Sequence, residues 1–248
     1  MTVSAVLQAR DSTAGANGSE ADPALQVRTQ FLRRVAHDIA SPTGVTLTVL
    51  EELAGSERPR PELVAMARRS LKRLMRLSEH LALVAELESG TLQPELGTVD
   101  ARALTKHAMD DAVGIDGRKD VVAACDLPAS PLLVTGDPRL LHVVIREIVG
   151  NALKLASSRV EVSVKAENGK VVIRVDDDGP GFAEDARATM GRRFVRRSAS
   201  RGLGLSLSMA FDILRDHDGT LELQSSLLPP GRRGVAGSAV VVTLPCAT

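Results

Sequence analysis

The chain has 248 residues, of which 44% are hydrophobic and 25% are charged, a balance typical of globular proteins and sufficient for two modest domains. Lys plus Arg equals Asp plus Glu at 31 each, and aromatic residues make up only 2%. This composition provides neither a global basic field nor an aromatic stacking platform, so we expect no nucleic-acid partner. No run approaches the ~20 apolar residues that span a bilayer, so we expect no membrane segment on this chain and a cytoplasmic location. Cys125 and Cys246 are isolated and are expected to be free thiols.

The first half of the chain predicts a helical hairpin. Residues 1–22 lack apolar periodicity and are expected to be a flexible N-terminal tail. From residue 23, apolar residues recur at alternating steps of three and four, which predicts two long amphipathic helices. One hairpin cannot bury both apolar stripes, so we expect residues 23–96 to dimerise into a four-helix bundle. The stripes comprise Leu32, Val35, Ile39, Pro42, Thr46, Val49 and Leu53, then Leu71, Leu74, Leu77, Leu81 and Val84.

Residues 97–248 are predicted to form a second domain of mixed helices and strands. Alternating apolar and charged residues around the turn at 167–170 predict a β-hairpin. Asp137 and the proline after it predict the start of a helix that runs to about residue 156. The alternation along the strands indicates that helices cover one face of the sheet. The other predicted elements are helices over 104–113 and 203–217 and strands over 121–127, 132–135, 219–225 and 236–244.

His37 is a candidate nucleophile on the first helix. It is two residues from both Val35 and Ile39, which turns it about 200° from each around a helix. We therefore expect His37 to face solvent, where a neutral imidazole can attack an electrophile while Asp38 holds the other ring nitrogen. By residue type alone, a polar pair on a wet helix face is the commoner explanation.

Three segments of the second domain could contact a nucleotide. In REIVGNALKLA (146–156), Glu147, Asn151 and Lys154 share one helix face, where they could hold Mg²⁺ and phosphate. VDDDGPGF (175–182) ends a strand in carboxylates followed by two glycines, and RGLGLS (201–206) presents backbone N–H groups at a helix start. Each segment is weak alone, and neither a Walker P-loop nor a Rossmann fingerprint is present.

In this order and spacing, the segments resemble those of sensor histidine kinases of two-component systems. FLRRVAHDIASPTG (31–44) is similar to the H-box of that family, and the three later segments are similar to the N, G1 and G2 boxes of its GHKL ATPase domain. The resemblance covers about residues 24–245. It implies an α+β protein in which an N-terminal α-hairpin forms a dimeric four-helix bundle. An α/β two-layer sandwich, the Bergerat-type ATP-binding fold, follows over residues 97–248.

The resemblance also implies roles for residues of the H-box. His37 would carry the phosphoryl group, and Asp38 would be its acid/base partner. Ser41 stands where the family places a Thr or Asn that positions water for dephosphorylation of the partner.

The implied cofactors are ATP and Mg²⁺. Asp177 would recognise the adenine amino group, and Asn151 would coordinate Mg²⁺. Glu147 replaces a common Asn of these kinases, and in the gyrase and Hsp90 relatives a Glu here activates water. We therefore expect Glu147 to support ATP hydrolysis and to share the metal site. The remaining implied nucleotide contacts are Lys154, Gly179, Gly181, Arg196, Gly202, Leu203, Gly204 and Leu205.

These expectations combine into a homodimeric histidine kinase that phosphorylates His37 with ATP and passes the group to an Asp of a response regulator receiver domain. Its signal would come from a separate sensory partner or from sequence outside this chain. One alternative is a histidine phosphotransferase with a kinase-like fold and little or no ATP-dependent kinase activity. A second is a dimeric interaction module in which His37 is incidental. Retention of Asn151 and Asp177 favours the kinase.

Overall fold

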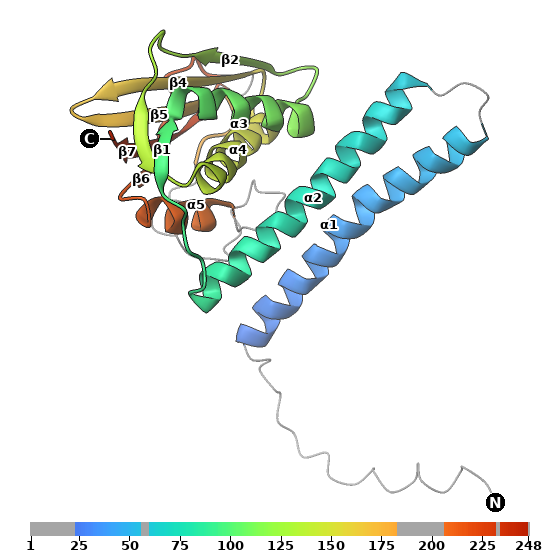
Figure 1. The fold of residues 1–248 in the computed structure, drawn as a ribbon. Coiled ribbons are helices and arrows are strands. Elements are labelled where there is room, and N and C mark those ends of the chain that lie inside the picture. Colours follow the sequence, from blue (N-terminus) through green and yellow to red (C-terminus); the bar gives the residue numbers. More distant parts are fainter. Residues whose placement is uncertain (1–22, 56–59, 183–205, 232–233, 248) are drawn as a thin grey trace, which may run out of the picture.

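The computed structural model describes residues 23–55, 60–182, 206–231 and 234–247. Two long antiparallel helices, α1 (Pro23–Ala54) and α2 (Pro61–Ser89), stand beside an α/β domain (Figure 1). Helix α2 starts with a proline at its first position and ends at Gly90, whose φ of 67° allows its N–H to bond the Glu86 carbonyl. Among the residues described, no helix has the length and apolar character needed to cross a membrane.

The predicted stripe of α1 is buried only in part. Pro42, Thr46 and Val49 are buried, whereas Leu32 and Ile39 remain 56% and 43% exposed. Near the open end of the hairpin, a small cluster forms around Val84 of α2. The predicted hairpin is therefore present, but a single copy of it leaves much of its apolar surface uncovered.

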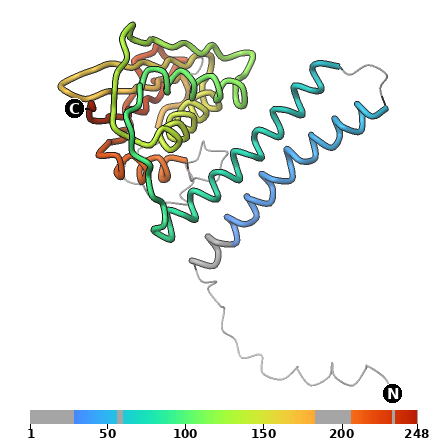
Figure 2. Tube along the Cα trace, in the orientation of Figure 1, coloured from blue at the N-terminus to red at the C-terminus, as the bar shows by residue number. Residues whose placement is uncertain are grey.

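The second domain contains the predicted elements and one additional strand, β1, which pairs antiparallel with β3. The five-stranded mixed sheet has the order β2-β4-β5-β7-β6, with β2 parallel to β4 and the other neighbours antiparallel. Figures 1 and 2 show α3, α4 and α5 on one face of this sheet. The predicted α+β class is confirmed. The elements are β1 (Gly97–Asp100), α3 (Ala101–Asp116), β2 (Val122–Asp126), β3 (Leu133–Gly136), α4 (Pro138–Leu155), β4 (Arg159–Glu167), β5 (Lys170–Asp177), α5 (Ser206–Arg215), β6 (Thr220–Ser225) and β7 (Ser238–Pro245).

Helix α4 is the central helix of the domain. Asp137 caps it by accepting hydrogen bonds from the backbone N–H groups of Arg139 (2.8 Å) and Leu140 (3.2 Å). Residues 143–150 of α4 are all buried. Leu83 of α2 is 2% exposed and belongs to the same hydrophobic core, so the end of the hairpin packs directly on the domain.

Candidate functional site

His37 lies on the solvent side of α1, as predicted. Its side chain is 78% exposed, and its Nδ1 lies 3.1 Å from the Asp38 carboxylate. An Nδ1–H that donates to Asp38 leaves Nε2 with its lone pair free and facing water. Ser41 is exposed one turn further along the helix. This geometry suits a nucleophilic imidazole oriented by its neighbour.

Asp177 occupies the end of β5, a central strand of the sheet. Its Oδ1 accepts a hydrogen bond from the Gly179 N–H (2.8 Å), and its Oδ2 accepts one from the Ser238 hydroxyl (2.6 Å). Burial raises the pKa of Asp177, although these hydrogen bonds oppose the rise. The Ser238 backbone N–H also bonds this carboxylate, which leaves at least one of the four acceptor positions on its two oxygens for a ligand N–H. The sequence did not identify Ser238, because its partner lies 61 residues earlier in the chain.

Two glycines after Asp177 allow close approach of the chain. A Cβ on Gly179 would lie 2.6 Å from the Leu155 carbonyl oxygen. Gly181 has a φ of 75°, which side chains rarely adopt, and a Cβ there would lie 2.8 Å from the Ala236 carbonyl oxygen. At both glycines predicted to shape an adenine pocket, a side chain would therefore collide with neighbouring backbone, which explains why glycine stands there.

Gly237 is a further glycine packed against Asp177. A Cβ there would collide with the backbone carbonyl of Asp177 and lie 2.9 Å from the Asp178 Cα. We expect Gly237→Ala to lower the free energy of unfolding by about 1–3 kcal/mol, because backbone on both sides must move. Chemical denaturation measures the change. Gly97→Ala is the matched control, since nothing lies within 4 Å of its Cβ; equal stability of the two variants would contradict the packing argument.

Asp178 has a structural role that the sequence did not reveal. Its Oδ1 accepts hydrogen bonds from the backbone N–H groups of Ser157, Ser158 and Arg159 at 2.8, 2.9 and 3.0 Å. Burial acts to raise the pKa of Asp178, but these bonds and the Ser158 hydroxyl prevail and lower it. Asp178 thus ties the end of α4 to the start of β4, while Asp177 beside it retains acceptor capacity.

The predicted N-box residues differ in their surroundings. Asn151 is half-buried one turn after Glu147, which is fully buried. Both oxygens of Glu147 face α2, where Arg76 Nη2 donates to Oε2 at 2.7 Å and His80 Nε2 lies 2.8 Å from Oε1. Burial alone would raise the pKa of Glu147, but His80 and Arg76 hold it well below its usual range.

The residues fit Mg²⁺ only in part. Mg²⁺ on a nucleotide needs one or two protein oxygens, since phosphates and water complete its shell. The Asn151 side-chain oxygen meets this requirement, whereas Glu147 is already paired with Arg76 and His80 of α2. Across the described ranges, no cluster of three or more His, Cys, Asp or Glu residues could hold a metal. Lys154 lies nearby, with its Nζ 3.4 Å from Asp116 Oδ2; burial and Arg76 lower its pKa.

Some predicted contacts fall outside the described residues. These are Arg196, Gly202, Leu203, Gly204 and Leu205. The candidate nucleotide residues that are described come from α4, the end of β5 and the start of β7. His37 is not among them: α1 lies on the far side of α2 from the α/β domain (Figures 1 and 2).

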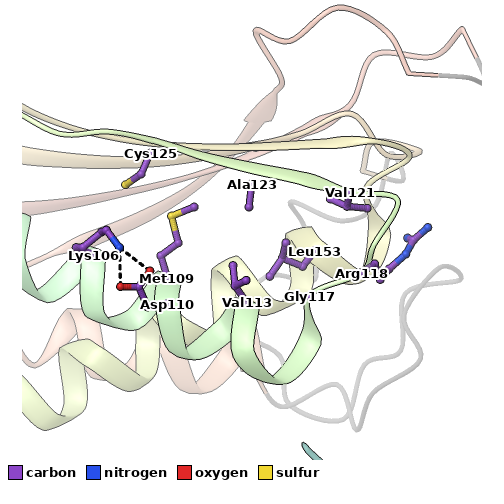
Figure 3. A pocket seen from close by; sticks show the side chains of 10 residues that line it. All are labelled: Lys106, Met109, Asp110, Val113, Gly117, Arg118, Val121, Ala123, Cys125 and Leu153. Carbon is purple, nitrogen blue, oxygen red and sulfur yellow. Dashed lines mark hydrogen bonds and ion pairs between the residues drawn. The ribbon is translucent and has the colours of Figure 1, made fainter. Parts of the chain in front are cut away.

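A separate cavity of about 420 Å³ lies between α3 and β2 (Figure 3). Met109, Val113 and Cys125 line it, and burial raises the pKa of the Cys125 thiol. Lys106 at its margin is paired with Asp110 at 2.6 Å. None of the predicted site residues lines this cavity, so the cavity is separate from the candidate functional site.

Fold and site together define a two-layer α/β ATPase-type domain joined to a helical hairpin that carries an exposed histidine. Residues 136–248 match the family of histidine kinase-, DNA gyrase B- and HSP90-like ATPases. The resemblance to sensor histidine kinases that the sequence suggested is confirmed by relatives of that description.

The signal transduction histidine-protein kinase AfsQ2 of Streptomyces coelicolor is 32% identical over 81% of this chain and 40% of its own length. The sensor-like histidine kinase SenX3 of Mycobacterium tuberculosis is 26% identical over 88% of this chain and 54% of its own length. The chain thus spans about half or less of these relatives. Full-length ShkA, solved in complex with AMPPNP, shares the fold with a TM-score of 0.60 and 21% identity, covering 90% of this chain and 46% of that protein.

Proposed function

We propose that this chain is an ATP-dependent protein-histidine kinase that phosphorylates His37 and passes the phosphoryl group to an aspartate of a response regulator. The observation that carries the proposal is the presence, on one chain, of an exposed His37 held by Asp38 and of a domain of the histidine kinase-like ATPase family. Neither feature alone would define the reaction.

The transfer is an in-line displacement at the γ-phosphorus of ATP. His37 Nε2 forms the N–P bond, the bond to the β-phosphate oxygen breaks, and ADP leaves. Asp38 accepts the Nδ1 proton as positive charge develops on the ring. Asp177 would hold the adenine through its amino group. Mg²⁺, held through Asn151, would offset charge on the phosphates.

The proposal includes a homodimer. In the described part of the hairpin, large apolar side chains stay exposed on both helices. An exposed apolar surface of this kind on a pair of helices indicates that another surface covers it. A second copy would cover them as a four-helix bundle. They are Leu32, Ile39, Val45, Leu47, Leu50, Val64, Met66, Leu71 and Met75.

The test is incubation of the full chain with Mg²⁺ and γ-labelled ATP. A phosphoramidate label that is lost in acid and survives alkali is the expected result, and a receiver domain added afterwards should remove it. A stable label in acid would instead indicate a hydroxyl acceptor and would contradict the proposal.

A histidine phosphotransferase is the second candidate, favoured by the engagement of Glu147 with α2. In that case the chain would bind nucleotide without becoming labelled. A phosphorylated receiver domain would then transfer its phosphoryl group to His37.

A further inference from the structure

Strand β2 forms one edge of the five-stranded sheet and, among the described residues, pairs only with β4. The Val122 N–H donates to the Ser158 carbonyl at 2.8 Å, so the backbone of Val122 faces β4. Backbone groups of successive residues in a strand point to opposite sides, so those of Ala123 and Cys125 point away from the sheet. Across the described ranges, no other backbone pairs with these outward N–H and C=O groups.

This edge lacks the usual protection against a further strand. Natural edge strands carry charges, prolines or bulges that prevent another chain from pairing with them. Strand β6, at the opposite edge, has the exposed Glu222 in its middle. Strand β2 is uncharged from Val122 to Cys125, and Val122 is 67% exposed. An unprotected apolar edge of this kind favours pairing with another segment.

The cavity between α3 and β2 lies beside the same edge (Figure 3). Ala123 and Cys125, whose backbone groups point away from the sheet, also line this cavity. On the α3 side, the lining includes Lys106 and Val113, and Val113 is 40% exposed. The volume of about 420 Å³ falls within the usual range of ligand pockets, about 300–1,000 Å³. Free main-chain groups and a pocket for side chains therefore meet at one place.

These two features are the requirements for recognition of an extended peptide by strand addition. Main-chain hydrogen bonds to the free edge supply affinity, and pockets for alternate side chains supply specificity. In an added strand, the residues opposite Ala123 and Cys125 point to the same face as those two side chains, toward the cavity. A small molecule would fill the cavity but leave the edge unpaired, so the two observations together favour a peptide.

The charges around the cavity indicate a basic residue in the bound segment. Lys106 is paired with Asp110, and Arg118 is paired with Asp120. Asp126, at the end of β2, is exposed and has no ion-pair partner within the described part of the chain. Its side chain lies on the face of the sheet opposite to the cavity, where a Lys or Arg of an added strand would meet it.

We propose that the cavity and the free edge of β2, together called the β2 edge site, bind an extended segment of a partner protein as an additional antiparallel strand. Antiparallel pairing is slightly the more stable per residue. In that direction the segment has the order basic, apolar, any, apolar. The basic residue lies opposite Asp126, and the two apolar residues lie opposite Cys125 and Ala123 and enter the cavity. The site is separate from His37 and Asp177, so it adds a docking surface to the proposed kinase.

Amide hydrogen exchange in the full chain, followed by NMR, tests the β2 edge site. In the chain alone, the amides of Ala123 and Cys125 should exchange quickly, whereas that of Ala124, which faces β4, should be protected. The probe is a pool of capped eight-residue peptides with Lys or Arg at the third position and Val, Ile, Leu or Phe at the fourth and sixth. With free peptide at about ten times Kd, exchange at Ala123 and Cys125 should slow about tenfold, while Ala124 should not change.

Two controls separate main-chain pairing from unspecific contact. The same pool with N-methyl groups on the fourth and sixth residues keeps every side chain but lacks the N–H groups that pair with β2. It should bind at least about tenfold more weakly. Asp126→Lys should weaken binding of the unmethylated pool about twofold to fivefold, the size of an exposed ion pair. Glu222→Lys on β6 is the matched control and should leave this binding unchanged.

Protection of the Ala123 and Cys125 amides in the chain alone would overturn the proposal. If that protection rose with protein concentration, a second copy would occupy the edge; if it did not, the chain would cover the edge itself. Unchanged exchange at the highest soluble concentration of the pool would also overturn it, and so would equal binding of the two pools. None of these measurements depends on label uptake, so they remain decisive if the kinase proposal fails.

Discussion

The His37→Gln variant is expected to take up no acid-labile label from γ-labelled ATP, a loss of at least about a thousandfold, while binding ATP as the wild type does. Glutamine is polar and tolerated on an exposed helix face, but it has no nucleophilic ring nitrogen. His37 is 78% exposed on a helix that lies away from the α/β domain, so neither stability nor nucleotide affinity should change. Label uptake and equilibrium binding of a fluorescent ATP analogue measure the two properties separately.

His107→Gln is the matched control, because His107 is also an exposed helical histidine and should keep full labelling. Asp38→Asn gives a second, smaller effect. Loss of the carboxylate 3.1 Å from Nδ1 removes the group that stabilises the developing imidazolium, and the labelling rate should drop about a hundredfold. Label retained in His37→Gln would place the acceptor elsewhere and exclude the proposed role of this residue.

The sequence predicted the hairpin and most of the sheet because their signals are local. The heptad spacing, the Asp137 cap and the turn near Gly169 each consist of residues that lie close together in the sequence and belong to the element that they predict. The same locality predicted that His37 faces solvent, which the structure confirms. Strand β1 was missed, because four residues with one buried side chain carry almost no periodicity.

The partners of the site residues could not be predicted from local patterns. Ser238 meets Asp177 only because β5 and β7 are neighbours in the sheet. Arg76 meets Glu147 across 71 residues, through the packing of two domains. One signal for that contact was present: Arg76, His80, Leu83 and Leu87 form a second stripe of α2, about 110° from the stripe that faces α1. A helix with two such stripes is expected to have two partners.

Asp177→Asn is expected to weaken ATP binding about a hundredfold or more. The Gly179 N–H can only donate, so an asparagine must keep its single side-chain oxygen there and turn its amide nitrogen toward Ser238. A ligand amino group that used the second oxygen then meets another donor, and a buried unpaired donor is costly. The rest of the pocket should persist, because the two side chains are nearly the same size. Titration of a fluorescent ATP analogue measures the affinity, with the exposed Asp126→Asn on β2 as control.

Inosine triphosphate separates recognition of adenine from general damage to the pocket. It lacks the amino group of adenine, so the wild type should bind it about as weakly as Asp177→Asn binds ATP. In Asp177→Asn the preference for ATP over inosine triphosphate should disappear, because the discriminating acceptor is gone. If Asp177→Asn bound both nucleotides more weakly but kept the wild-type ratio of the two affinities, Asp177 would only support the fold. In that case the adenine amino group would have to be recognised by another residue.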